Sequence, residues 1–133
     1  DTRGQAANLR PDEPLQGHSC KLSNWMDMLF DDGLGVSAGP LFMPEFDQCV
    51  GASSPEAGAS LMLSACSEES LQLWVHLSEG RIVLSQDPKL CITLASGAGR
   101  NAGGVQYLRR DLALAPCDLA ADGRQVWAFQ VPD

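Results

Sequence analysis

Residues 91–127 read CITLASGAGRNAGGVQYLRRDLALAPCDLAADGRQVW, and residues 49–74 read CVGASSPEAGASLMLSACSEESLQLW. Each stretch begins with a cysteine and an aliphatic residue, continues with the pattern Leu-x-Leu-x-x-Cys, and ends with Gln-x-Trp. The two leading cysteines, Cys49 and Cys91, lie 42 residues apart. Self-similarity of this kind is the signature of a repeated structural unit. The sequence therefore predicts two copies of one unit.

Short apolar runs separated by turn residues follow one another from about residue 46 onward. They predict strands near residues 60–66, 71–77, 81–85, 89–94, 105–108, 112–117 and 125–129. A spacing of roughly 8 to 12 residues between strands is typical of sandwiches and barrels. Thirteen Gly and eight Pro agree with a chain that turns often. We therefore expect an all-β fold.

Length, composition and charge limit the classes of protein to consider. The 133 residues fit one domain, and 44% of them are hydrophobic, which is enough for a core. The formal net charge of −8 repels phosphate backbones, so nucleic acid is not an expected partner. No stretch reaches the roughly 18 uninterrupted apolar residues of a membrane-spanning helix, so no membrane span is expected in this chain.

The combination of flanking cysteines with Gln-x-Trp resembles the ricin-type (Q-x-W) β-trefoil family, over residues 46–133. In that family three repeats surround a pseudo-threefold axis. The resemblance implies that Trp74 and Trp127 pack into a shared core. Gln72 and Gln125 are then expected to use both ends of their amides to satisfy backbone groups near the turn of each repeat.

Five widely spaced cysteines without a C-x-x-C pair disfavour a structural zinc site and favour disulfides. The resemblance implies bonds between Cys49 and Cys66 and between Cys91 and Cys117, with Cys20 left over. Disulfides place a protein in an oxidising compartment, either outside the cell or in an organelle lumen, peripheral to any membrane. Buried reduced thiols in a cytosolic protein are the alternative.

Residues 1–45 differ from the two repeats in composition and in their pattern of apolar residues. The opening 17 residues are polar and interrupted by prolines, which predicts an irregular, extended arm. Residues 23–33 then predict a short helix that buries Trp25, with a short strand as the alternative. Because two repeats alone would leave open sheet edges, we expect this region to form a degenerate first repeat that completes a modified trefoil, with Trp25 in place of the missing core tryptophan.

No group of residues indicates catalysis. His18 and His76 lie outside any nucleophile motif, and His76 is expected to face solvent from a strand or to bond a neighbour. The glycine-rich residues 96–104 partly match a dinucleotide fingerprint, but no helix follows, so a hairpin or inter-strand loop is expected. The acidic pairs at 31–32 and 68–69 are expected to be solvated charge. We therefore expect no enzyme activity, no cofactor and no metal.

The sugar site of the family is impaired in both repeats. In sugar-binding members an Asp two residues after each leading Cys accepts hydrogen bonds from sugar hydroxyls, and here Gly51 and Thr93 stand at those positions. Neither offers the charge-assisted bonds of a carboxylate. A sugar would then depend on Thr93, Asn101 and Tyr107, with Tyr107 as the ring that stacks; its alternative role is to cover the barrel.

These features together predict a non-catalytic binding module that has lost the usual sugar site. It is expected to serve as a protein-binding or accessory structural subunit of a larger assembly, with an N-terminal arm that orders on a partner. Other protein subunits are the expected partners. A carbohydrate-binding, ricin-type lectin with glycan ligands is the first alternative, and the targeting module of an enzyme is the second.

Overall fold

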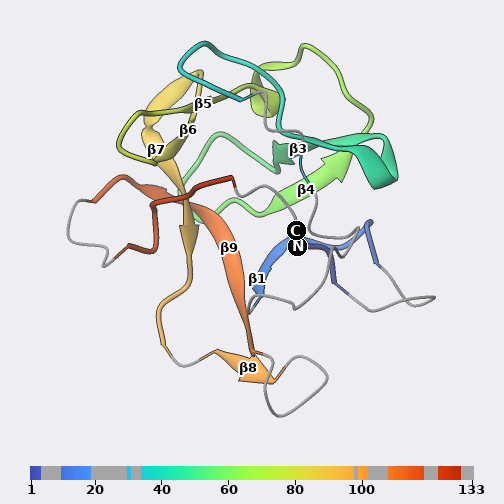
Figure 1. Cartoon of the computed structure of the whole chain (residues 1–133), viewed down its shortest axis with the longest axis vertical. Coiled ribbons are helices and arrows are strands. Elements are labelled where there is room, and N and C mark those ends of the chain that lie inside the picture. The colour runs from blue at the N-terminus through green and yellow to red at the C-terminus, as the bar shows by residue number, and fades with distance from the viewer. Residues whose placement is uncertain are drawn as a thin grey trace.

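A computed structural model of the chain describes residues 1–3, 10–18, 30, 34–97, 99–101, 108–118 and 123–129. Over these residues the protein is built from antiparallel strands (Figure 1). Its helical structure there consists of two short 3-10 segments, η3 (Pro44–Phe46) and η4 (Ser70–Gln72). The predicted all-β class is confirmed. No helix within the described ranges is long and apolar enough to cross a membrane.

The strands form two sheets. The larger sheet has the order β1-β9-β7-β6-β5, with β8 also paired to β9. Its strands are β1 (Gln16–His18), β5 (Trp74–His76), β6 (Ile82–Leu84), β7 (Asp87–Leu94), β8 (Arg100–Asn101) and β9 (Leu108–Pro116). The smaller sheet has the order β2-β3-β4, formed by β2 (Phe42–Met43), β3 (Gln48–Ala52) and β4 (Leu61–Ser64). An isolated bridge between Ser60 and Ala113 joins the two sheets.

Most of the predicted strands are present, with two departures. The run at 71–77 is divided, because η4 occupies its start and β5 begins at Trp74. The run at 125–129 is not a strand. Its first residue ends the turn at residues 123–125, and the N–H of Trp127 donates to the carbonyl of Gly80 at 2.9 Å. Of the predicted strand at 105–108, only Leu108 is described, and it begins β9.

Two segments of the chain have the same strand pairing, and we call them the first unit (residues 39–76) and the second unit (residues 80–129). The units begin 10 and 11 residues before their leading cysteines, Cys49 and Cys91. The opposed Cα pairs are Phe42 with Cys49 and Cys49 with Ser64 in the first unit, and Val83 with Cys91 and Cys91 with Ala115 in the second.

The hydrophobic core joins both units and the N-terminal segment. Leu61, Trp74, Leu84 and Leu114 are among its most buried members, and Leu15 from the N-terminal segment is only 2% exposed.

The described part of the N-terminal segment, where an extended arm is predicted, contacts both β9 and the core. β1 pairs with β9, and the N–H of Leu15 donates to the carbonyl of Leu61 at 2.8 Å. Thr2 is fully buried, and the N–H of Gln16 donates to the carbonyl of Asp1. These residues pack on the rest of the molecule because the edge of β9 supplies hydrogen-bond partners and the core accepts Leu15.

Apart from Phe30, the predicted helix at 23–33 lies outside the described residues, and so do Trp25 and Cys20.

Candidate functional site

The glutamine of the first Gln-x-Trp motif bonds backbone and side-chain groups of the loop that follows β4. The 3-10 segment η4 places Gln72 so that its side chain is buried. Its Nε2 donates to Ser64 Oγ at 2.6 Å and to the carbonyl of Ala65 at 3.0 Å, while its Oε1 accepts from the N–H of Ser67 at 2.8 Å. Both ends of the amide are used, as predicted.

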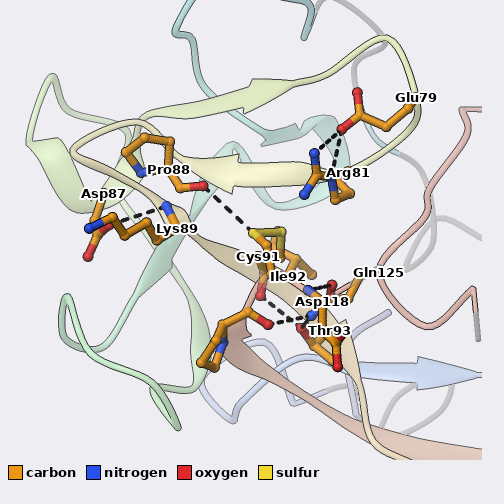
Figure 2. The surroundings of a disulfide bond; sticks show 12 residues. Glu79, Arg81, Asp87, Pro88, Lys89, Cys91, Ile92, Thr93, Asp118 and Gln125 are labelled. Carbon is orange, nitrogen blue, oxygen red and sulfur yellow. Dashed lines mark hydrogen bonds and ion pairs between the residues drawn. A yellow bond between two sulfur atoms is a disulfide. The ribbon is translucent and has the colours of Figure 1, made fainter. Parts of the chain in front are cut away.

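The second glutamine makes the corresponding set of bonds around the end of β9 (Figure 2). Gln125 Nε2 donates to Thr93 Oγ1 at 3.0 Å and to the carbonyl of Pro116 at 2.9 Å. Its Oε1 accepts from the N–H of Asp118 at 2.8 Å. A buried amide with its donors and its acceptor satisfied fixes the loop it bonds, since leaving any of these groups unpaired would cost about 1–3 kcal/mol.

Both tryptophans bond the strand that carries the leading cysteine. Trp74 Nε1 donates to the carbonyl of Val50 in β3 at 2.9 Å, and Trp127 Nε1 donates to the carbonyl of Ile92 in β7 at 3.0 Å. Trp74 is fully buried, whereas Trp127 is partly buried against the core cluster. In each unit the indole ring therefore joins the Gln-x-Trp segment to the strand that carries the leading cysteine.

The two disulfides implied by the resemblance are present. Cys49 is bonded to Cys66 across 17 residues, and Cys91 to Cys117 across 26 residues. The longer separation in the second unit comes from the connection between β7 and β9, which includes β8. Two structural disulfides are compatible with an oxidising compartment.

Thr93 and Gly51, the two residues that follow the leading cysteines by two positions, belong to this internal framework. Thr93 is 9% exposed, and its hydroxyl donates to the carbonyl of Cys91 at 2.9 Å while accepting from Gln125. Gly51 is buried, and a Cβ atom added there would lie 3.1 Å from Cγ of Gln72. The glutamine thus occupies the space that a side chain at residue 51 would need.

The three residues proposed for a sugar site are not brought together by the described structure. Thr93 lies opposite Ala113, and Asn101 lies opposite Leu108, five residues away on β9. At the rise of a β-strand, five residues correspond to about 17 Å. Tyr107 lies outside the described residues.

A surface hollow of about 570 Å³ lies between the β5–β6 hairpin and residues 126–129. His76 lies in β5, as predicted, and its Nε2 bonds the carbonyl of Trp127 at 2.9 Å, while its ring meets Phe129 edge-on at 5.4 Å. At the hairpin tip, a backbone hydrogen bond at Glu79 and the Arg81 guanidinium lower the pKa of the Glu79 carboxyl.

Two further features were not anticipated from the sequence. Gly39 and Gly80 open the two units, and each pairs through backbone hydrogen bonds with the tryptophan of its own unit. The signal was available as the related segments GPLFM at 39–43 and GRIVL at 80–84. The second feature is a group of basic side chains on β1, β9 and β8, and no local motif indicates it because it depends on strand register.

Comparisons of the chain with protein-family models, with curated proteins and with solved structures found no significant match. Within the part of the chain that the structure describes, no group of three or more His, Cys, Asp or Glu side chains could hold a metal ion.

Proposed function

We propose that this chain is a non-catalytic, protein-binding module, the accessory subunit of a larger assembly, built on a β-trefoil framework that has lost the family's sugar site. The observation that carries the proposal is the internal use of Thr93. Its buried hydroxyl already bonds Cys91 and Gln125, so it has little capacity left for a sugar. At the matching position of the first unit, Gly51 has no side chain, and Gln72 lies against it.

The trefoil framework is supported by the correspondence of the two units. They share strand register, a disulfide from the leading cysteine, an amide network and an indole-to-strand hydrogen bond. A third portion of the core comes from the N-terminal segment, through buried Leu15 and Leu34. This is the segment that a degenerate first repeat would occupy.

Protein binding is favoured by what the surface offers. Large apolar side chains at Val36, Leu108 and Val126 are 73%, 45% and 55% exposed. Aromatic side chains at interfaces usually carry sugar or protein contacts, but Trp74 is fully buried and Trp127 partly so, and both bond the framework. The described surface therefore supports contact with another protein better than stacking on a sugar ring.

The test is to purify the native chain from its source under mild conditions and to identify its stoichiometric partners by cross-linking and mass spectrometry. A glycan array is screened in parallel with the parent and with Thr93→Val. We expect a protein partner at defined stoichiometry and no glycan hit. A native monomer that binds a glycan, with binding abolished in Thr93→Val, would favour the lectin instead.

A further inference from the structure

Basic side chains are concentrated at one end of the larger sheet. The short strand β8 and the adjoining part of β9 extend away from the two units, and β1 lies along β9 (Figure 1). The chain has 9 basic and 17 acidic side chains. Despite this excess of acid, arginines from three separate segments meet at this end. They are Arg3, Arg100 and Arg109.

Strand register places three basic residues in one row across three strands. His18 in β1 lies directly opposite Arg109 in β9, and Arg109 lies directly opposite Arg100 in β8. Directly opposed residues of antiparallel strands project to the same face of the sheet. We call these three residues and Arg3 the basic row. Arg110 projects to the other face, where its Cγ would lie 3.3 Å from a Cβ added at Gly99.

The carboxylate of Asp111 pairs with two arginines of the basic row. Asp111 Oδ1 lies 2.6 Å from Arg100 Nη2 and 3.5 Å from Arg3 Nη2. Arg109 Nη1 instead donates to the neutral amide oxygen of Gln16 at 3.5 Å. Two guanidinium groups thus share one carboxylate, and a third bonds a neutral amide, on a protein whose formal charge is −8.

Folding stability does not account for this arrangement. Like charges directly opposite each other on neighbouring strands are destabilising. The pair between Arg100 and Asp111 is 57% and 56% exposed, and exposed pairs contribute little. A cluster that costs stability and remains accessible to solvent is typical of a binding surface.

We infer that the basic row binds an acidic segment of a partner polypeptide, through two or more Asp or Glu carboxylates. Guanidinium groups bind carboxylates through paired, charge-assisted hydrogen bonds. Alternate side chains of an extended peptide lie about 7 Å apart, which long arginine side chains on neighbouring strands can match. The inference rests on the proposed function, because it names the chemistry of the protein partner.

The charge of the rest of the molecule favours a short acidic segment over a long polyanion. Nucleic acids and sulfated polysaccharides would extend beyond the row and meet the negative field of the remaining surface. A peptide with a few carboxylates stays within the row.

The direct test is fluorescence anisotropy with a labelled peptide of alternating Glu and Gly, at about 0.05 M and about 0.5 M salt. The parent is compared with Arg100→Gln/Arg109→Gln and with the control Arg81→Gln/Lys89→Gln, which removes the same charge elsewhere. We expect binding that salt weakens, at least about tenfold weaker in the row variant and within about twofold of the parent in the control. Near-ultraviolet circular dichroism checks that each variant is folded.

Three outcomes would overturn the inference: no binding of the peptide by the parent, equal losses in both double variants, or tighter row-dependent binding of a DNA or heparin oligosaccharide than of the peptide. These outcomes are separable from failure of the proposed function. If a native partner is captured equally well by Arg100→Gln/Arg109→Gln, the inference about the basic row is refuted, but the proposed protein-binding function stands. If the basic row binds the peptide but the chain is monomeric in its native source, the proposed role as a subunit is refuted, and the peptide-binding property of the basic row stands.

Discussion

The first and second units use the same scaffold with different side chains at the same places. In the first unit the amide of Gln72 reaches Ser64, and residue 51 is a glycine. In the second unit the amide of Gln125 reaches Thr93, and the position matching Ser64 is an alanine, Ala115. The hydroxyl that accepts from the glutamine has thus moved from one strand of the pair to the other.

This exchange shows which features of the unit are fixed and which vary. The amide, indole and disulfide connections are made twice, by different local sequences, which indicates that they hold the unit together. The connections between paired strands differ much more. Residues 53–60 link β3 to β4, whereas the link from β7 to β9 adds β8 and carries Arg100 of the basic row. The bonds that hold each unit together are therefore the same, and the link between the paired strands is what differs.

The largest expected effect comes from truncating the core tryptophans. Trp74→Ala should lower the free energy of unfolding by about 3–5 kcal/mol, because it removes a fully buried ring and leaves a cavity. Trp127→Ala should cost less, since that ring is only partly buried. Urea titration of both variants measures the difference, and a Trp74→Ala protein as stable as the parent would contradict the role of Trp74 in the core.

Removing either disulfide should have the next largest effect. The double variants Cys49→Ala/Cys66→Ala and Cys91→Ala/Cys117→Ala should each lose about 3 kcal/mol, and the second should lose a few tenths more because it closes a longer loop. Urea midpoints of the two variants against the parent give the measurement. If either midpoint stays unchanged, that bond does not constrain its unit.

Removing the hydroxyls that accept hydrogen bonds from the glutamines should affect stability differently in the two units. Thr93→Val should cost about 1–3 kcal/mol, since the hydroxyl is buried and has two partners. Ser64→Ala is the matched change in the first unit, and it should cost less because residue 64 is exposed and Gln72 keeps its bond to Ala65. Equal losses in thermal or urea unfolding would mean that the two networks contribute equally.

The glycines that open the units should differ in their tolerance of a side chain, and Gly39→Ala is the smallest effect expected. Gly80 has a φ of +109°, and an added Cβ would lie 2.6 Å from Cγ1 of Val126, so Gly80→Ala should cost about 1–3 kcal/mol. Gly39→Ala should be close to neutral, because its nearest neighbours lie 4.0 Å away and its φ is not left-handed. Comparable unfolding curves for both variants would argue against the strained turn at Gly80.

The parts of the fold predictable from sequence are those with local signals. Short apolar runs predicted β4, β6, β7 and β9, and the family resemblance carried by the repeated Cys and Gln-x-Trp motifs implied both disulfides. The strand expected at 125–129 failed because Gln125 ends a turn and its side chain bonds the framework, which periodicity cannot detect. The polar, proline-containing N-terminus suggested an arm, yet a single apolar residue, Leu15, and the open edge of β9 were enough to order its described part.

The candidate site was less predictable than the fold. The likeness to sugar-binding proteins drew attention to Thr93, whose hydroxyl is held inside the unit. The basic row could not be found, because His18, Arg100 and Arg109 become neighbours only through the register of three strands. Cross-strand register follows from tertiary pairing and leaves no periodic trace in the sequence.

Hydrogen exchange of the indole N–H groups, followed by NMR and assigned with Trp→Phe variants, tests most directly whether both Gln-x-Trp motifs are internal parts of equivalent units. The hydrogen bonds from Trp74 to Val50 and from Trp127 to Ile92 predict exchange slower than that of a free indole by about a thousandfold or more at Trp74, with weaker but clear protection at Trp127. Exchange of both groups at the rate of a free indole would contradict that equivalence.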